Sequence, residues 1–414
     1  MRYLVVGAGS QGAAAAAILA RDADVTGFTL ADYDEELVAK VKAKLMTDGA
    51  AADKIQLAQV DARDIDAVTK LARECEVILN FVHMDYSKGI RAAALAAGVH
   101  YVDTASDLQW QHDIAFEHQV NDDDAFRKAG LCGVACSGDT PGVANAMARH
   151  AADMLDEIDE LMIRLGMRFA SGDPNVVFHP FDPGWCPDVA LQDFHDKACV
   201  FTGGKPTMQG PFANPEVYRF PEPVGEVLIC SHSHDESYTL PFFIGKGLKE
   251  CDFKYAVDEQ AGTLVAMGFG DPEKVIELRD GTKVRPFEVA MALTPQAKEG
   301  FFAETKEGLA NFPDWDASMV IEANGRKDGK AKRVRVHRAY TVNQKTRGDL
   351  LASLGTTNPL VAAPAIAAAK LIARGEVKPG VMAVEALDPL AYLKEVAAIM
   401  PLDIDVSITT ALPA

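Results

Sequence analysis

The chain has 414 residues, with 60 aspartates and glutamates against 41 lysines and arginines, so its net charge is −19. A surface this acidic repels the phosphates of nucleic acids and anionic lipids, so we expect neither as a partner. The length suits two or three globular domains. The 7 cysteines are odd in number and form no Cys-x-x-Cys pair, which argues against a disulfide framework or a zinc ribbon.

The chain begins with a β-type run over residues 3–6, which leaves no place for a signal peptide. Apolar stretches are interrupted by glycine, proline or charged residues before they reach the ~18 residues that a membrane helix needs. We therefore expect a cytoplasmic protein without a membrane span.

Short β-type runs alternate with helical patterns over residues 1–135. We expect strands over 3–6, 29–32, 55–60, 77–81, 99–102 and 131–135, and helices over 11–20, 35–45, 65–73, 88–97 and 116–128. Strands that alternate with helices form right-handed βαβ units. The sequence therefore predicts an α/β domain, a Rossmann-type doubly wound parallel sheet, over residues 1–140.

The pattern changes near Gly138, where a long helix is expected from Pro141 to about Leu155. Strand-like runs at 161–165, 224–231 and 332–339 follow, which predicts an α+β domain with an antiparallel sheet over residues 141–350. Helices are expected again over 360–373 and 389–398, in a C-terminal segment that covers residues 351–414.

The sequence Gly7-Ala8-Gly9-Ser10-Gln11-Gly12 fits the pattern Gly-x-Gly-x-x-Gly between the first strand and the first helix. In this context Gly7 allows the tight turn, Gly9 lets the backbone approach a pyrophosphate, and Gly12 lets the helix pack on the strand. Free N–H groups at the helix N-terminus would bind the phosphates. These residues, with Ser10 and Gln11, predict a dinucleotide site.

Asp32 ends the second strand, 20 residues after Gly12. A carboxylate at this position accepts hydrogen bonds from the adenosine ribose and repels a 2′-phosphate, so we favour NAD over NADP. Alternatively, Asp32 only caps the helix that follows.

Asn80 and Asp103 end the fourth and fifth strands, at the edge of a parallel sheet where ligands bind. Both are candidate cofactor contacts near the nicotinamide, and Asp103 is also a candidate catalytic residue. Capping of the loops that follow is the alternative role for each.

Four segments together resemble the saccharopine dehydrogenase-like family, which includes saccharopine reductases, lysine 6-dehydrogenases and carboxynorspermidine dehydrogenases. They are residues 5–12, 101–104 (Tyr-Val-Asp-Thr), 138–143 (Gly-Asp-Thr-Pro-Gly-Val) and 233–236 (Ser-His-Asp-Glu). The C-terminal run from Pro359 through Glu385-Ala386-Leu387-Asp388-Pro389 is also similar to that family's ending.

The resemblance implies a Rossmann domain, an inserted catalytic domain with a mixed sheet, and C-terminal helices that return to the Rossmann side. It also implies NAD(P)-dependent interconversion of an amine and an imine, on amino-acid or polyamine-like substrates, in a homodimer. Many relatives carry aspartate directly before the Pro-Gly step, whereas this chain has Thr140 there and the acid at Asp139. That departure weakens any catalytic role for this loop.

The residues Ser231-His232-Ser233-His234-Asp235-Glu236 form the richest polar cluster of the second domain. In a strand, His232, His234 and Glu236 would share one face and form the wall of a cleft. Transfer of a hydride at a C–N carbon needs a group that moves a proton at nitrogen. We expect His234 first, and Glu236 second, to be that catalytic group.

Two other interpretations of this cluster stay open. It could be a solvated strand face, or the two histidines and the glutamate could ligate a metal ion, although no second cluster completes the coordination and we expect no metal. Arg164 and Arg168 share a face of a predicted strand and could bind a substrate carboxylate, if they are not on the surface.

The sequence therefore predicts an NAD-dependent oxidoreductase of a CH–NH or C=N bond. One alternative is a Rossmann dehydrogenase of an alcohol or sugar, but the lysine typical of those enzymes is absent from residues 101–106. The other is a protein that binds NAD as a sensor without turnover.

Overall fold

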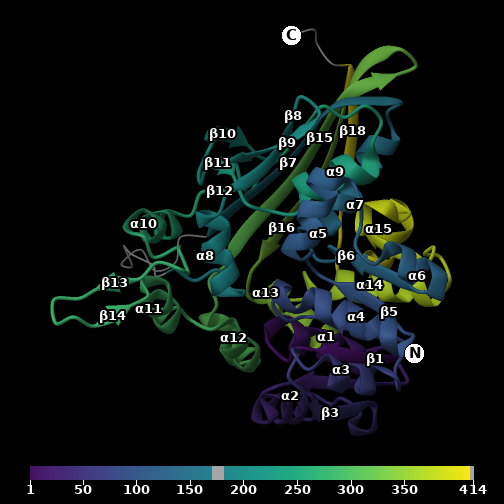
Figure 1. Cartoon of the computed structure of the whole chain (residues 1–414), viewed down its shortest axis with the longest axis vertical. Coiled ribbons are helices and arrows are strands. Elements are labelled where there is room, and N and C mark those ends of the chain that lie inside the picture. Colours follow the sequence, from purple (N-terminus) through teal and green to yellow (C-terminus); the bar gives the residue numbers. More distant parts are fainter. Residues whose placement is uncertain (170–180, 411–414) are drawn as a thin grey trace.

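The computed structural model describes residues 1–169 and 181–410, which build two β-sheets (Figure 1). The first is a 7-stranded sheet in which every strand pair is parallel. Its strands in spatial order are β17 (Gly380–Ala383), β6 (Cys132–Ala135), β5 (His100–Asp103), β4 (Val77–Asn80), β1 (Arg2–Val6), β2 (Gly27–Asp32) and β3 (Ile55–Gln59). The predicted doubly wound Rossmann fold is confirmed.

Successive side chains of β1 point to opposite faces of the sheet, and both faces are buried. Tyr3 and Val5 belong to one buried hydrophobic cluster, and Leu4 and Val6 belong to another. The helices of this part are α1 (Ser10–Arg21), α2 (Glu35–Thr47), α3 (Ile65–Ala72), α4 (Ser87–Ala97), α5 (Leu108–His112) and α6 (Asp123–Ala129), with short turns η1 (Ala52–Lys54) and η2 (Met84–Tyr86) and the π-helical turn η3 (Asp113–Glu117). Helices α1 and α2 supply the first cluster, and α3 and α4 supply the second.

One predicted helix is wrong. The pattern over 116–128 indicates a single helix, but the structure has α5 and η3 before a break and α6 after it. His118 (φ 56°) and Asp122 (φ 64°) adopt the left-handed conformation, which no α-helix continues through.

The second sheet has 9 strands and is mixed. Its main path is β10 (Glu216–Arg219), β11 (Glu226–Ser231), β12 (Glu250–Ala256), β7 (Glu157–Phe169), β15 (Trp315–Lys327), β16 (Lys330–Val342) and β18 (Asp405–Thr410), with β8 (Ala198–Thr202) and β9 (Lys205–Gln209) attached to β12. The strands pair antiparallel except for β12 and β7, which are parallel. The mixed sheet that the family resemblance implied is confirmed. The antiparallel sheet predicted from the strand pattern is not, because β12 and β7 are parallel.

The remaining elements connect or cover the two sheets. They are α7 (Val143–Asp153), α8 (Pro187–His195), α9 (Glu236–Ile244), α10 (Glu259–Met267), α11 (Pro286–Leu293), α12 (Ala297–Ala303), α13 (Gln344–Leu354), α14 (Ala362–Ala373) and α15 (Pro389–Ile399), with the turns η4 (Gly308–Asn311) and η5 (Val384–Ala386) and the hairpin β13 (Ile276–Glu277) and β14 (Lys283–Val284). The hairpin projects from the body of the molecule (Figure 1).

The C-terminal segment crosses between the two sheets. Helix α14 packs on β4 and β5, β17 joins the Rossmann sheet beside β6, and β18 pairs with β16 at the edge of the second sheet. The expected return of C-terminal helices to the Rossmann side is therefore confirmed. The segment also contributes a strand to each sheet, and the division of the chain at residues 140 and 350 stays a prediction.

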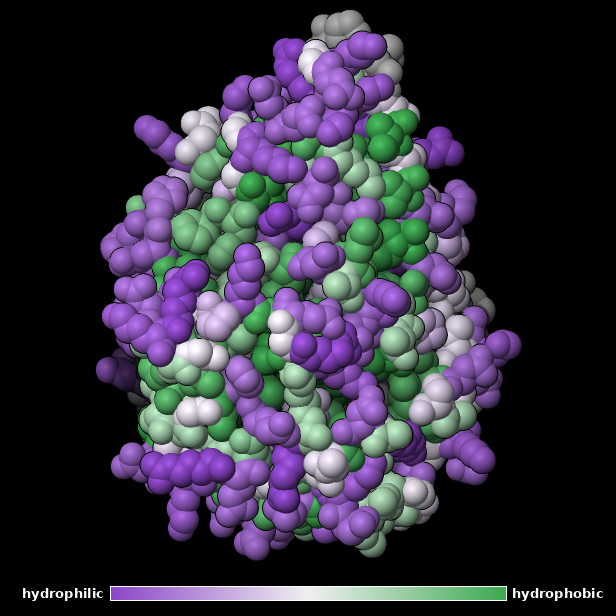
Figure 2. Space-filling view, turned by 90° about the vertical axis from the view of Figure 1, so that its right-hand side faces the viewer, coloured by the Kyte–Doolittle hydropathy of each residue, from purple (hydrophilic) through white to green (hydrophobic). Residues whose placement is uncertain are grey.

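No helix among the described residues is long and apolar enough to cross a membrane. In Figure 2, hydrophilic side chains are spread over the whole of one face, and hydrophobic residues lie between them rather than in one continuous band.

Candidate active site

The glycine loop has the geometry that the sequence predicted. Gly7 has φ +97°, and a Cβ on Gly12 would lie 1.8 Å from the carbonyl oxygen of Gly7, so neither position accepts a larger residue unchanged. A Cβ on Gly9 would meet nothing within 4 Å, which means that the backbone at the start of α1 is open. Residues of this loop therefore fit a pyrophosphate held by the N-terminus of α1.

Asp32 is bound to this loop and does not cap the next helix. Its Oδ2 accepts a hydrogen bond from the backbone N–H of Ala8 over 2.7 Å, and its Oδ1 accepts one from Asp34 over 3.0 Å. The cap of α2 is Asp34, which accepts from the backbone N–H of Leu37. The carboxylate of Asp32 thus lies directly beside the glycine loop.

A cleft of about 1740 Å³ lies between the Rossmann sheet and the second sheet. On the Rossmann side it is lined by Gly9, Ser10 and Gln11. On the side of the second sheet its wall includes His232, His234 and Asp235. Among the described residues, the Oε1 atom of Gln11 is buried without a hydrogen-bond partner, so a polar group of a ligand can bind there.

The predicted strand over 232–236 is wrong, although residues 232–235 do line the cleft. Strand β11 ends at Ser231 and helix α9 begins at Glu236, so His234 lies in the turn between them. The pattern misleads because Glu236 starts a helix, in which its side chain faces the protein interior. His232 and Glu236 therefore do not share a strand face with His234.

His234 is held between an aromatic ring and a carboxylate. Its ring stacks on Phe253, with 4.3 Å between ring centroids, and its Nδ1 lies 2.5 Å from Oε2 of Glu236. The other oxygen of Glu236 accepts a hydrogen bond from the hydroxyl of Thr140. Glu236 is fully buried, so these two contacts fix the imidazole in one orientation.

Electrostatics around His234 favour its charged form. Burial alone would lower the pKa of His234, but the carboxylate of Glu236, and beyond it Asp193 and Asp235, raise that pKa to about 9. His232 is the opposite case, because burial and the neighbouring His234 hold its pKa well below the usual value. At neutral pH, His234 is therefore an imidazolium and His232 is neutral.

Asp235 connects the turn to the Rossmann domain. It accepts hydrogen bonds from the backbone N–H and the hydroxyl of Ser106, over 3.1 and 3.0 Å, and from the side chain of Gln111. Burial raises the pKa of Asp235 to about 6. These contacts place His234 at a fixed position relative to the carboxyl ends of the Rossmann strands.

A second charged group in the cleft is Arg338 on β16. Its Nη1 donates to Oδ1 of Asp139 over 2.6 Å, and its guanidinium lies 4.4 Å from the ring centroid of Tyr340. All three residues line the cleft. No pattern in the sequence distinguishes Arg338, because its strand, 332–339, alternates charged and apolar residues as a solvated strand does.

Residues 3–134 match the family described as the saccharopine dehydrogenase NADP binding domain. The chain is also similar over its whole length to carboxynorspermidine synthase of Vibrio cholerae serotype O1, at 27% identity over 96% of this chain and 95% of the relative. The carboxynorspermidine synthase of Vibrio alginolyticus is 26% identical over 96% of this chain and 95% of its own.

Two solved structures share the fold at low sequence identity. Saccharopine dehydrogenase (L-Glu forming) of Saccharomyces cerevisiae superposes with a TM-score of 0.67 at 13% identity, covering 99% of this chain and 100% of that one. The homospermidine synthase of Legionella pneumophila, solved in complex with NAD, superposes with a TM-score of 0.63 at 11% identity. The superposition covers 99% of this chain and 91% of that one.

The N-terminal part of the chain, residues 3–134, is thus similar to the saccharopine dehydrogenase NADP binding domain, and the whole chain shares the fold of saccharopine dehydrogenase. The predicted resemblance is thus confirmed, as is NAD(P) binding by the N-terminal domain. The match to an NADP binding domain and the similarity to these relatives support an oxidoreductase.

Asn80 and Asp103 are hydrogen-bonded to each other at the ends of their strands. The side-chain amide of Asn80 donates to Oδ2 of Asp103 over 3.0 Å, and the hydroxyl of Tyr101 also donates to Asp103. Burial raises the pKa of Asp103. Neither residue lines the cleft in the described part of the chain. Their roles in cofactor binding and catalysis stay predictions.

The two arginines named from the sequence lie elsewhere. Arg164 is buried in the second sheet, where it pairs with Asp252 over 2.7 Å and with Glu216 over 3.1 Å. Arg168 is exposed. In the described chain neither lines the cleft.

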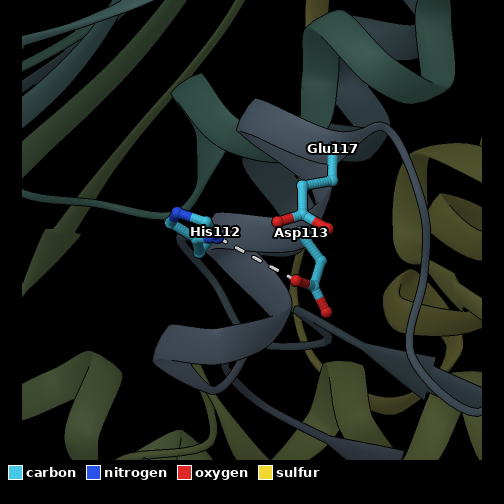
Figure 3. Close-up of side chains that lie close together, drawn as sticks. All are labelled: His112, Asp113 and Glu117. Carbon is cyan, nitrogen blue, oxygen red and sulfur yellow. Dashed lines mark ion pairs between the residues drawn. The ribbon is translucent and has the colours of Figure 1, made fainter.

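Among the described residues, one group of potential metal ligands, drawn in Figure 3, does not line the cleft. Its members are His112, Asp113 and Glu117, from α5 and η3. Because His112 and Glu117 are exposed and no further ligand completes the group among the described residues, it gives no support for a metal site. His232, His234 and Glu236 do not form such a group.

Proposed function

We propose that this chain is a saccharopine dehydrogenase-like protein, an NAD(P)-dependent oxidoreductase of the CH–NH or C=N bond of an amino-acid or polyamine-like substrate. The observation that carries the proposal is the position of His234, a cleft histidine held in its charged form by Glu236, in the cleft that also contains the glycine loop. The names of the two curated relatives and of the homospermidine synthase support the same class of substrate.

A bound nicotinamide supplies or accepts a hydride at the carbon of the C–N bond. Reduction of an imine also needs one proton at nitrogen. His234 is an acid of suitable strength at neutral pH, because its pKa is raised to about 9. Since Nδ1 is held by Glu236, Nε2 is the atom that donates this proton, and in the reverse direction it accepts it. Glu236 acts as a positioning residue through His234.

The lining of the cleft is acidic. It includes Asp182, Asp188, Asp193, Asp196, Asp235 and Asp258. Against these, the described residues that line the cleft include two arginines, Arg338 and Arg347, and no lysine. A cleft of one sign attracts ligands of the other, so this lining favours a cationic amine.

Asp193 is the acid we infer to bind the amine. It lies on α8 and in the cleft, where its charge interacts with His234. In the described part of the structure its carboxylate accepts no hydrogen bond. Burial raises the pKa of Asp193 well above the usual value, so a nearby cation is needed to stabilise its ionised form. An ammonium group of the substrate would supply the missing partner.

We infer NAD as the preferred cofactor. Asp32 places its negative charge beside the glycine loop, where it would repel the 2′-phosphate of NADP. No arginine or lysine follows Asp32 within residues 33–39.

The first test is a panel of lysine, ornithine, diamines, saccharopine and carboxylated polyamines with NAD or NADP, read at the absorbance band of NADH. For an amine in this panel that the wild type oxidises, we expect His234→Ala to lower turnover at least about tenfold while NAD binding, measured by calorimetry, is retained.

His112→Ala is the matched control, because His112 is an exposed histidine outside the cleft. Turnover of the His112 variant should equal that of the wild type. Unchanged turnover of the His234 variant would remove His234 from the mechanism, and turnover only of alcohols would contradict the proposed bond.

We also propose a homodimer, on the basis of the family resemblance. Val217 and Leu228, on the paired strands β10 and β11, are exposed on the second sheet and would be covered by such a contact. Sedimentation at twice the chain mass of 44.5 kDa would support this, and sedimentation at the chain mass would contradict it.

A further inference from the structure

Thr140 lines the cleft and binds the carboxylate that holds His234. Its hydroxyl donates a hydrogen bond to Oε1 of Glu236, while Oε2 of the same carboxylate binds Nδ1 of His234 over 2.5 Å. Among the described residues, these two side chains are the hydrogen-bond partners of the Glu236 carboxylate. Thr140 is therefore the one neutral donor to a carboxylate that is fully buried.

The loop that carries Thr140 is fixed by two elements. The backbone N–H of Ala144, in the first turn of α7, donates to the carbonyl oxygen of Asp139 over 3.0 Å. The side chain of Asp139 accepts a hydrogen bond from Arg338 on β16 over 2.6 Å. Because Thr140 follows Asp139 directly in the chain, α7 and β16 together keep its hydroxyl directed at Glu236.

Proton release by His234 would leave Glu236 as a buried negative charge without a cation beside it. The ionisable groups that interact with this pair come from several elements, and none of them supplies a second positive charge. They are Asp193 on α8, Asp235 before α9, Glu385 in η5, Cys136 after β6, Cys251 on β12 and the neutral His232 after β11. The hydroxyl of Thr140 is thus the group that compensates the carboxylate once the proton has left.

From this arrangement we propose that Thr140 is a positioning residue, whose hydroxyl stabilises the charge of Glu236 and so makes proton release by His234 easier. A hydrogen bond to the charged form of an acid favours that form. The effect on turnover rests on the proposed function, in which Nε2 of His234 exchanges a proton with the substrate nitrogen. In amine oxidation the hydride goes to the nicotinamide and the proton goes to Nε2, which must therefore be free.

Titration of His234 by NMR tests the proposal without turnover. Protein labelled with ¹³C at histidine Cε1 is titrated, and the resonance of His234 is assigned by its absence from His234→Ala. The pKa of His234 is expected at about 9 in the wild type. Thr140→Val keeps the shape of the side chain but lacks the donor, so it should raise that pKa by about one unit or more. Thr140→Ser keeps the donor and should leave the pKa within about 0.3 of the wild-type value.

The pH dependence of turnover is the second measurement. For an amine that the wild type oxidises, we expect kcat of Thr140→Val to lie about tenfold below that of Thr140→Ser at about pH 8, and within about twofold of it at about pH 10, because a raised pKa removes the free base only at the lower pH. The pKa values of Asp235 and Glu385, about 6 and about 7, lie below this range. A role of Thr140 in packing alone would lower kcat by the same factor at both pH values.

Thr282→Val is the matched control. The hydroxyl of Thr282 also binds a carboxylate, that of Asp280, but on the β13–β14 hairpin and not in the lining of the cleft. Neither the pKa of His234 nor the pH dependence of kcat should change in this variant.

If Thr140→Val does not fold, Thr140→Ala lacks the same donor without adding a second methyl group, and it should also raise the pKa of His234. A pKa within about 0.3 of the wild-type value, in whichever of the two variants folds, would overturn the proposal. Failure of the proposed function gives a different result, because the wild type would then oxidise no amine while the NMR titration would still show whether Thr140 acts on His234.

Discussion

Asp32 has a structural role in the glycine loop, and we infer that it also selects the cofactor. It accepts hydrogen bonds from the backbone N–H groups of Ala8 and Asp34, and these hold the end of β2 beside the glycine loop. The same negative charge would repel a 2′-phosphate. Replacement by a neutral residue of the same shape should therefore change cofactor preference more than it changes the fold.

For Asp32→Asn we expect the ratio of kcat/KM with NADP to kcat/KM with NAD to rise at least about tenfold. Initial rates with each cofactor provide the measurement. Asp34→Asn is the control, because it removes a charge two residues away and still caps α2. A ratio that moves equally in both variants would mean that Asp32 does not select the cofactor.

At the scale of residues, sequence patterns predict local geometry well and long-range partners poorly. The roles of Gly7, Gly9 and Gly12 follow from sterics within one turn, and the structure shows the expected crowding and open space. Arg338 was missed because its partner Asp139 lies 199 residues away in the chain. The one local signal, Asp139 shifted by one position from the family pattern, did not indicate an arginine.

At the scale of elements, three segments meet behind His234. Helix α7 contributes Asn145, helix α9 contributes Thr239 and Glu236, and turn η5 contributes Glu385. The side-chain amide of Asn145 donates to Glu385 over 3.1 Å and to the hydroxyl of Thr239 over 3.2 Å. Burial raises the pKa of Glu385 to about 7, and nearby Glu236 adds to the effect.

Glu385 therefore binds a proton more tightly in the folded chain than in the unfolded chain, where a glutamate has a pKa of about 4.3. Its contribution to stability is complete below about pH 4 and is lost as the pH rises toward 7. Glu385→Gln cannot ionise, so it should gain up to about 3 kcal/mol of unfolding free energy relative to the wild type between pH 5 and pH 8.

Urea unfolding at the two pH values measures this gain. Glu376→Gln, at an exposed position after α14, is the control and should show the same difference from the wild type at both. A difference for Glu385→Gln that does not change with pH would contradict the raised pKa.

Element boundaries show where the sequence pattern is ambiguous. The polar cluster at 231–236 has the period of a strand, but β11 ends at Ser231 because the chain must turn into α9. The buried position of Glu236 depends on its packing below the cleft, which no local pattern contains. Helices rich in alanine, such as α14, were predicted closely because buried small residues and the terminating Gly375 are local signals.

At the scale of the whole molecule, the active site depends on two sheets that face one cleft. The order of alternating strands and helices predicts the parallel sheet, because βαβ units have one hand. The partners in the second sheet could not be predicted, since β7 pairs with β15 and β12 from distant parts of the chain. The crossing of the C-terminal segment to β16 has no sequence signal for the same reason.

The acidic charge of the molecule and of its cleft predicts a salt effect on substrate capture. We expect kcat/KM for a diamine to fall about threefold or more as the ionic strength rises from ~0.02 to ~0.2 M, because salt screens the attraction of the cationic amine. The value of kcat at saturating diamine should change little, which separates capture from chemistry. A kcat/KM independent of salt would contradict a role for the acidic lining.

Transfer of deuterium from NADH labelled at nicotinamide C4 tests the central proposal most directly. An aldehyde and a diamine, which form an imine in solution, are incubated with the enzyme and the labelled cofactor, and the products are examined by mass spectrometry. We predict one deuterium on the carbon bonded to nitrogen in a new secondary amine, formed at least about tenfold more slowly with His234→Ala. Deuterium only in an alcohol, or in no product, would contradict an enzyme of the C–N bond.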